Sequence, residues 1–447
     1  MQRELNPKIW SKTAHRQNDA ISIGGCTAIE LAETFGTPAF IIDEADFKSR
    51  AAQWKSGLDN HFGSNAGTAY YAAKAFISKD VARWASEAGL GLDVCTGGEL
   101  AVAIAADFPA NRIEMHGNNK SELEIAEAID YRVGVIVLDS LQEIDRVARI
   151  AHSKGVVQKV LIRLTTGVEA HTHESIKTAH EDVKFGFSMA SGAAWDAVLS
   201  TSKHESLQLI GFHAHIGSQI FATDAFETSA QRLISMVVRY KSEFGADLTD
   251  LNLGGGYGIA YTEDDTPITP EFALERLSAV VKDACNKSGI SIPKISFEPG
   301  RAIVGPSMTT LYEVGTTKEV RLEDGSMRWY ISVDGGMSDN IRPGLYDAEY
   351  SITLANRLSG AELRRSRIVG KHCETGDVVI KDVQLPSDIA PGDLLAVPAT
   401  GAYGRSMASN YNHMTRPPVI SVLNGEARIM IRRETYADLL ALEVDDE

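Results

Sequence analysis

The chain has few cysteines, and they are scattered. Its four cysteines, Cys26, Cys95, Cys285 and Cys373, form no CxxC pair and show no metal-ligand spacing. A disulfide framework and a zinc module are therefore not expected, and a reducing, cytoplasmic location fits. No apolar run reaches membrane-spanning length, and the polar N-terminus lacks the apolar core of a signal peptide. The sequence thus predicts no membrane partner.

Basic residues are also in short supply. Lys and Arg number 44 against 60 Asp and Glu, which makes the formal net charge −16. Nucleic acid is not an expected partner, because phosphate binding needs a basic face. At 447 residues the chain is too long for one ordinary core, so two domains are expected.

Two kinds of sequence segment alternate between about residues 67 and 300. Short apolar runs predict buried parallel strands, and longer amphipathic segments between them predict helices. Eight such units favour a (β/α)₈ TIM-type barrel over a doubly wound sheet, which rarely has eight consecutive parallel units. The predicted strands are 68–75, 90–96, 112–117, 134–139, 159–165, 209–217, 248–256 and 294–300. The predicted helices include 78–89, 98–108, 121–132, 140–155, 224–245 and 270–289.

After Arg301 the strand-like segments are separated by Gly, Pro and Asp turns, which predicts a second, mostly antiparallel β domain. Residues 418–425 and 427–434 predict a hairpin around an Asn-Gly turn. The strand-like residues 39–43 could belong to either domain on pattern alone. The long polar stretch 165–188 predicts a functional loop.

Polar residues gather at the predicted carboxyl ends of the barrel strands, the rim where barrel enzymes build their active sites. They are Lys74, Asp93, His116, Arg163, His213, His215, the run Gly254-Gly255-Gly256 and the run Glu298-Pro299-Gly300-Arg301.

Two of these features predict binding sites, one for an anion at the glycine run and one for an aldehyde at Lys74. The glycine run exposes N–H groups after strand seven, where barrels often bind phosphate, and Arg301 adds charge. A tight turn is the plain alternative for the run. Lys74 in an apolar strand is costly as a cation, which suits it to form an imine. A rim lysine that reaches solvent is the alternative.

Glu298 beside a phosphate needs a cationic partner. The protonated pyridine nitrogen of pyridoxal 5′-phosphate would satisfy it, although an ion pair with Arg301 is also possible. His213 or His215 could lie flat against a planar cofactor, and their spacing does not separate them. The pairs His171/His173 and His213/His215 could bind zinc, but no carboxylate is arranged as a third ligand, so no metal is expected.

Long motifs make the chain resemble the fold-type III pyridoxal-phosphate decarboxylases, and within them the diaminopimelate decarboxylase family. The matching segments are 35–44, 70–75, 92–100, 116–121, 167–187, 211–220, 251–259, 298–301, 333–350, 370–377 and 401–412. The resemblance implies a barrel domain at 46–305, with 1–45 and 306–447 forming the β domain. It also implies a homodimer in which residues 373–377 reach into the partner's site.

The resemblance further implies a role for each matched residue. Lys74 would hold pyridoxal phosphate, His215 would stack on its ring and Glu298 would pair with its ring nitrogen. The other implied cofactor contacts are Asp93, Ser218, Gly254, Gly255, Gly256, Gly300, Arg301 and Tyr403. The implied substrate contacts are Arg301, Arg342, Tyr346, Glu374 and Tyr403. Cys373 would be the proton donor after CO₂ leaves.

The implied reaction is decarboxylation of meso-2,6-diaminopimelate to L-lysine, the last step of lysine biosynthesis. An ornithine- or arginine-type decarboxylase and an amino-acid racemase of the same fold are alternatives. The motif at 337–346 argues against an ornithine- or arginine-type decarboxylase, because the substrate of a polyamine-forming enzyme has no distal carboxylate to hold. A non-enzymatic pyridoxal-phosphate homeostasis protein is a further alternative, disfavoured by the β domain.

Overall fold

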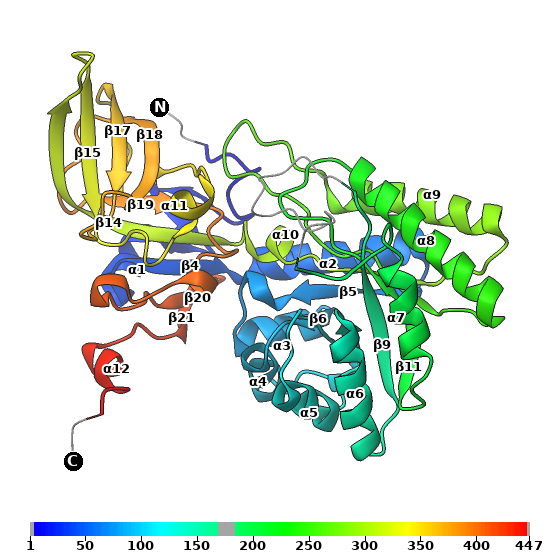
Figure 1. The fold of residues 1–447 in the computed structure, drawn as a ribbon. Coiled ribbons are helices and arrows are strands. Elements are labelled where there is room, and N and C mark those ends of the chain that lie inside the picture. Colours follow the sequence, from blue (N-terminus) through cyan, green and yellow to red (C-terminus); the bar gives the residue numbers. More distant parts are fainter. Residues whose placement is uncertain (1–3, 169–183, 445–447) are drawn as a thin grey trace. The chain divides into compact units, whose positions relative to one another are not determined.

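The structure is a computed structural model that describes residues 4–168 and 184–444. The chain divides into two compact units (Figure 1). The barrel unit comprises Arg50–Gly258 and Pro267–Ala302, and the β unit comprises Met1–Ser49, Ile259–Thr266 and Ile303–Glu447. Most of the predicted functional loop at 165–188, with His171 and His173, lies outside the described residues.

The barrel unit contains a closed parallel barrel in the described part of the chain, as predicted. Its strands run in the order β9-β11-β12-β13-β5-β6-β7-β8, and a β8–β9 pairing closes the ring. A short strand, β10 (Phe187–Ser188), pairs with β9 outside the ring. The barrel strands are β5 (Gly67–Ala72), β6 (Gly91–Val94), β7 (Ile113–Met115), β8 (Val135–Leu138), β9 (Gln158–Thr165), β11 (Leu207–His213), β12 (Asp250–Asn252) and β13 (Lys294–Phe297).

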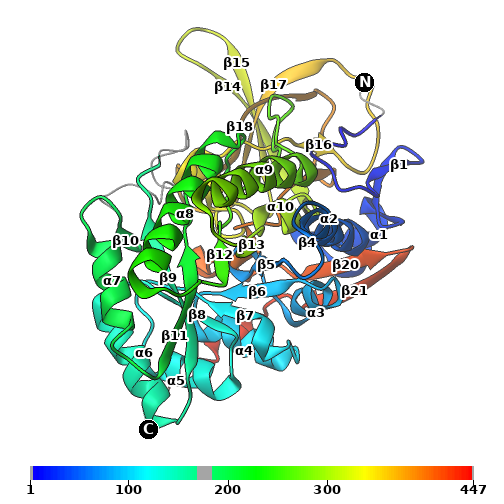
Figure 2. The same ribbon diagram turned by 90° about the vertical axis from the view of Figure 1, so that its right-hand side faces the viewer.

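Helices lie outside these strands (Figure 2). They are α2 (Glu44–Phe62), α3 (Lys79–Glu87), α4 (Gly97–Ala105), α5 (Glu122–Tyr131), α6 (Leu141–Ser153), α7 (Ala193–Thr201), α8 (Asp224–Phe244) and α9 (Pro270–Ser288). A short helix, α10 (Arg301–Val304), follows β13. Local chemistry sets their ends: Ser121 and Glu124 form a capping box on α5, and α9 begins with Pro270 and is capped at its C-terminus by Gly289. Among the described residues, no helix is long and apolar enough to cross a membrane.

Two local predictions in the barrel were wrong. Lys74 does not lie within a strand, because β5 ends at Ala72 and Lys74 occupies a single 3₁₀ turn, η1 (Ala73–Ala75). His215 does not share a strand with His213, because β11 ends at His213. Both residues therefore lie just after a barrel strand ends. Their side chains need not follow the alternation between opposite faces that holds within a strand.

The β unit is built on a sheet with the order β18-β17-β15-β14-β4-β20-β21, and β19 pairs with β14. Most pairings are antiparallel, while β15–β17 and β4–β20 are parallel. The predicted Asn-Gly hairpin is confirmed between β20 and β21, with positive φ at Asn424 and Gly425. The sheet strands are β4 (Ala39–Asp43), β14 (Met308–Arg321), β15 (Met327–Val333), β16 (Thr353–Leu354), β17 (Leu363–Val369), β18 (Val378–Pro386), β19 (Leu394–Val397), β20 (Val419–Leu423) and β21 (Glu426–Ile431).

The N-terminal arm belongs to this sheet, because β4 lies between β14 and β20 and pairs with both. A small separate sheet and three helices complete the described part of the unit. Their bounds are β1 (His15–Gln17), β2 (Ala20–Ile23), β3 (Cys26–Thr27), α1 (Ala28–Phe35), α11 (Arg342–Tyr346) and α12 (Tyr436–Leu440).

Candidate active site

Lys74 is held by a buried carboxylate. Its Nζ donates a hydrogen bond to Asp93 Oδ2 at 2.9 Å, and the Asp93 side chain on β6 is fully buried. The Lys74 side chain keeps 35% of its surface exposed, so part of it is reachable from solvent. A lysine fixed by a carboxylate yet open to solvent can meet an incoming carbonyl group.

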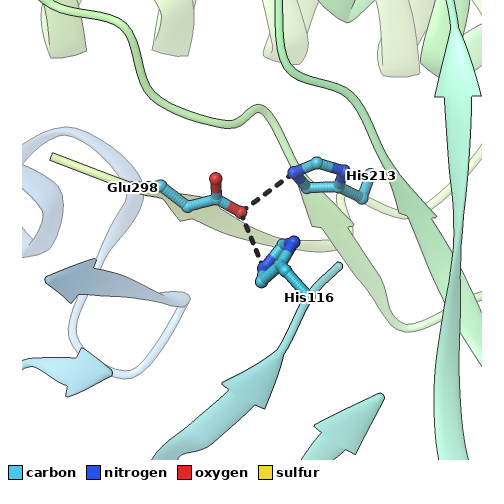
Figure 3. Close-up of side chains that lie close together, drawn as sticks. All are labelled: His116, His213 and Glu298. Atoms are coloured by element: carbon cyan, nitrogen blue, oxygen red, sulfur yellow. Dashed lines mark ion pairs between the residues drawn. The ribbon is translucent and has the colours of Figure 1, made fainter. Parts of the chain in front are cut away.

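Glu298 lies at the centre of a buried polar cluster (Figure 3). Its Oε1 lies 2.9 Å from His213 Nε2 and 3.2 Å from His116 Nε2. The other carboxylate oxygen points away from both rings in Figure 3. His213 ends β11, His116 follows β7 and Glu298 follows β13, so three strand ends bring the cluster together.

The cluster favours an ionised Glu298. Burial opposes ionisation of this carboxyl, but His213 and His116 outweigh it and hold its pKa well below the ordinary value. Burial would lower the pKa of His116, but Asp93 and Glu298 overcome it and raise that pKa to about 10. Burial lowers the pKa of His213 to about 4, so this ring is neutral. The result is a fixed anion beside a fixed cation in a buried environment.

The same three side chains could also hold a metal ion, since their ligand atoms lie within 4.8 Å of one another. Metal binding needs a neutral imidazole. The pKa of His116, raised to about 10 by Asp93 and Glu298 against the effect of burial, means that a proton competes for this position.

The glycine run forms a close backbone cradle. A Cβ on Gly254, Gly255 or Gly256 would lie 2.1–2.2 Å from a backbone oxygen, so no side chain fits at these positions. Gly254 and Gly256 also have φ of +73° and +113°, a region that favours glycine. Gly255 N–H donates to His215 Nδ1 at 3.3 Å, which ties that ring to the run.

A cation and a hydroxyl also lie together in the barrel unit. Arg301 Nη2 donates to Ser218 Oγ at 2.8 Å, although the two residues are 83 positions apart in sequence. Arg301 is buried at the first position of α10, directly after Gly300. Gly300 itself has no room for a side chain, since a Cβ there would lie 2.9 Å from that of Ala72.

These groups fit pyridoxal phosphate. A buried carboxylate kept ionised suits a protonated ring nitrogen, and Lys74 suits the aldehyde. The glycine cradle, Ser218 and Arg301 suit a phosphate. The structure brings Lys74 and Asp93 together, Ser218 and Arg301 together, and His215 and the glycine run together.

In the β unit, Asp377 organises the segment that carries Cys373 and Glu374. Its Oδ2 accepts the backbone N–H of His372 at 2.9 Å and contacts His372 Nδ1 at 2.8 Å. Its Oδ1 accepts the backbone N–H of Met337 at 2.7 Å. Asp377 and His372 are buried, whereas Cys373 and Glu374 are exposed. Buried Asp377 and His372 therefore hold a segment in which the Cys373 and Glu374 side chains are exposed.

The segment 401–412 joins the same group of loops. Asn412 Oδ1 accepts the backbone N–H of Cys373 at 2.9 Å. Ser409 N–H donates to Ser338 O at 2.9 Å. Tyr403 has φ of +59°, an uncommon conformation for a residue with a large side chain and one that often marks a functional position.

Arg342 and Tyr346 lie at the two ends of α11. The Arg342 guanidinium is buried, lies 4.6 Å from the centre of the Tyr261 ring and hydrogen-bonds to the Tyr350 hydroxyl. Tyr346 is partly exposed. Stacking on aromatic rings holds a guanidinium in one plane, which suits bidentate recognition of a carboxylate.

Sequence reasoning missed two members of the Glu298 cluster. Asn252 ends β12 and donates to Glu298, and Glu114 on β7 lies 3.5 Å from His116. Both are polar residues inside short buried strands. A polar side chain at an inward position of an apolar strand was the available signal, since burial without a partner is costly.

Known proteins similar to this chain agree with the geometry. The family model described as pyridoxal-dependent decarboxylase, pyridoxal binding domain, matches residues 44–305. Diaminopimelate decarboxylase of Mycobacterium tuberculosis is 51% identical over 446 residues, covering 98% of each chain. That of Bacillus subtilis is 45% identical over 428 residues, covering 96% of each. The crystal structure of diaminopimelate decarboxylase from M. jannaschii with L-lysine has a TM-score of 0.91 at 30% identity, covering 98% of each chain.

Proposed function

This chain belongs to the diaminopimelate decarboxylase family of pyridoxal-phosphate enzymes, and we propose that Lys74 carries its cofactor. Its reaction is the decarboxylation of meso-2,6-diaminopimelate to L-lysine and CO₂. The observation that carries the assignment of residues is the buried Glu298 cluster, in one barrel with a carboxylate-held lysine and a glycine cradle.

Pyridoxal phosphate supplies an electron sink that accepts the electron pair left when CO₂ departs. Glu298 stays anionic to pair with the ring nitrogen, since His116 and His213 outweigh burial and keep its pKa low. Asp93 holds Lys74, and His215 is assigned to lie against the ring. Phosphate binding is assigned to Ser218, Gly254, Gly255, Gly256, Gly300, Arg301 and Tyr403.

In the β unit, Cys373 is assigned as the general acid that returns a proton to the substrate carbon. Arg342 and Tyr346, with Arg301 and Tyr403, are assigned to substrate carboxylate binding, and Glu374 to the distal ammonium. Charge complementarity supports this assignment, because the substrate carries a carboxylate and an ammonium at each end.

A purified-protein assay tests the substrate assignment. CO₂ release should be rapid with meso-diaminopimelate and far slower with ornithine, arginine or lysine. A Glu374→Gln variant should raise KM for diaminopimelate by about tenfold, because one charge-assisted hydrogen bond is weakened. Turnover of ornithine in preference to diaminopimelate would overturn the assignment.

We also propose a homodimer in which the 373–377 segment of one protomer serves the partner's site. Mixing inactive Lys74→Ala and Cys373→Ala proteins, with subunit exchange, tests it. If sites are shared, hybrid dimers contain one intact site, and activity returns to about a quarter of the wild-type level. Recovery of no activity from exchanged hybrids would contradict shared sites.

A cytoplasmic location is part of the same proposal. Cys26, Cys95, Cys285 and Cys373 are all free thiols, which suits a reducing compartment. Fractionation of cells that express the protein should recover it with cytoplasmic markers.

A further inference from the structure

Asn252 connects two parts of the candidate cofactor site through one side chain. It is the last residue of β12 and is 1% exposed. Its Nδ2 donates to Glu298 Oε1 at 2.9 Å and to Glu114 Oε2 at 2.7 Å. Its Oδ1 accepts the backbone N–H of Gly254 at 2.8 Å. An amide nitrogen has two hydrogens, so each carboxylate receives one of them.

The chemistry of the neighbours determines which way the amide points. The Gly254 N–H can only donate, so it requires the amide oxygen. The ionised Glu298 carboxylate can only accept, so it requires the amide nitrogen. A flipped amide would bring an oxygen against two carboxylates and a nitrogen against an N–H. The oxygen and the nitrogen of the Asn252 amide therefore each face the partner that they require. A carboxylate or an apolar side chain could not satisfy both partners.

We propose that Asn252 is a positioning residue that fixes the Glu298 carboxylate relative to the Gly254–Gly256 cradle, so that both bind one cofactor molecule in register. The inference rests on the proposed function, which assigns Glu298 to the ring nitrogen and the cradle to the phosphate. A rigid cofactor spans both groups, so a shift of either relative to the other loses contact at one end.

Backbone contacts alone do not set this geometry. Glu298 N–H donates to Gly254 O at 3.0 Å, which spaces the two main chains. The direction of the carboxylate, however, depends on side-chain torsions beyond the main chain. Oε1 meets Asn252 Nδ2, His213 Nε2 and His116 Nε2 within 3.2 Å. Asn252 differs from the two imidazoles in that its donor is uncharged at every pH.

Two substitutions separate the contacts. Asn252→Asp is isosteric and keeps an oxygen for Gly254 N–H, but it removes the donor to both carboxylates. Asn252→Ala removes every contact. Ser278→Ala is the matched control, since Ser278 is buried in α9 of the same unit and its hydroxyl donates to His61 O at 2.7 Å. It loses one part-buried hydrogen bond to the main chain of α2, and that bond involves neither Glu298 nor Gly254.

The measurements are the dissociation constants of each apoprotein for pyridoxal phosphate and for inorganic phosphate, with the visible absorption band of the bound cofactor. Both Asn252 variants should bind pyridoxal phosphate about tenfold to a hundredfold more weakly, as expected for hydrogen bonds to charged groups. Their absorption band should shift or change its pH dependence. Asn252→Ala should also weaken phosphate binding severalfold, and Asn252→Asp should weaken it less. Ser278→Ala should match the wild type.

A purely structural role predicts a different outcome. Both Asn252 variants would then lower thermal stability but bind both probes within twofold of the wild type with an unchanged band, and this would overturn the inference. Should Asn252→Ala fail to fold, Asn252→Asp alone carries the same test. Failure of the wild-type protein to bind pyridoxal phosphate would instead overturn the proposed function.

Discussion

The Glu298 cluster in the barrel unit and the Cys373–Glu374 segment in the β unit are built in opposite ways. Glu298, His116 and His213 are nearly fully buried and contact one another directly. Cys373 and Glu374 are exposed. The buried Asp377 carboxylate holds their segment by accepting the backbone N–H of His372. A fixed cofactor charge needs a dry, permanent environment, whereas groups that meet an incoming substrate must stay open to it.

The largest expected effect is on the barrel side of this comparison. Lys74→Ala should lower activity by about a thousandfold or more, because it removes the residue that we propose to hold the cofactor covalently. The visible absorption band of the bound cofactor should vanish. Lys79→Ala, an exposed lysine at the start of α3, serves as the control and should leave both unchanged. A full band in Lys74→Ala would contradict the assignment.

On the β side, Cys373→Ala should reduce kcat by about a hundredfold to ten-thousandfold, the usual contribution of a general acid. The absorption band should persist, because the thiol is proposed to act on substrate and not to bind the cofactor. Cys285→Ala, which changes a buried thiol of α9, is the control and should retain turnover. Equal turnover by Cys373→Ala and the wild type would remove the proton-donor role.

The buried cluster should also make stability depend on pH. Asp93 and Glu298 raise the pKa of His116 above the ordinary 6.5 to about 10, against the effect of burial. Because this pKa is raised, the contribution of His116 to the free energy of unfolding is complete below about pH 6.5 and is lost as pH rises toward 10. Burial also raises the pKa of Glu114 to about 7. The free energy of unfolding should therefore also fall as pH rises from about 4.5 to 7. His213, with a pKa lowered to about 4, stays neutral across this window.

Thermal unfolding of the apoprotein across pH 6.5–10 measures this effect. The free energy of unfolding of the wild type should fall by a few kcal/mol over this range, at about 1.4 kcal/mol for each pKa unit. His116→Gln should show a flatter profile above pH 7. His204→Gln, which removes a partly exposed contact with Asp145, should keep the wild-type slope. A wild-type slope in His116→Gln would show that His116 is not the cation of the cluster.

The smallest expected effect concerns Asp377. Asp377→Asn weakens three contacts to Met337 and His372, so the Cys373 segment should lose its fixed position. We expect kcat/KM to fall about tenfold, as for one hydrogen bond to a charged group. The cofactor band should not change. Asp382→Asn, which breaks an exposed ion pair with Arg365, is the control and should change kcat/KM little. A changed band in Asp377→Asn would mean that the two sides are not independent.

The sequence by itself determined the repeating plan of this protein. Eight apolar runs separated by amphipathic segments specify the barrel, because strand and helix periods are local properties of the chain. The Asn-Gly turn specifies its hairpin for the same reason. The glycine run and Glu298 stood out because their positions follow strands.

Tertiary structure decided which of these residues meet. His213 turns to Glu298 while His215 contacts Gly255, a difference that their spacing concealed. Asn252 and Glu114 became part of the site only when β12, β13 and β7 brought them together. Hydrogen bonds between residues 46 and 138 positions apart depend on how the barrel closes, and no local pattern encodes that closure.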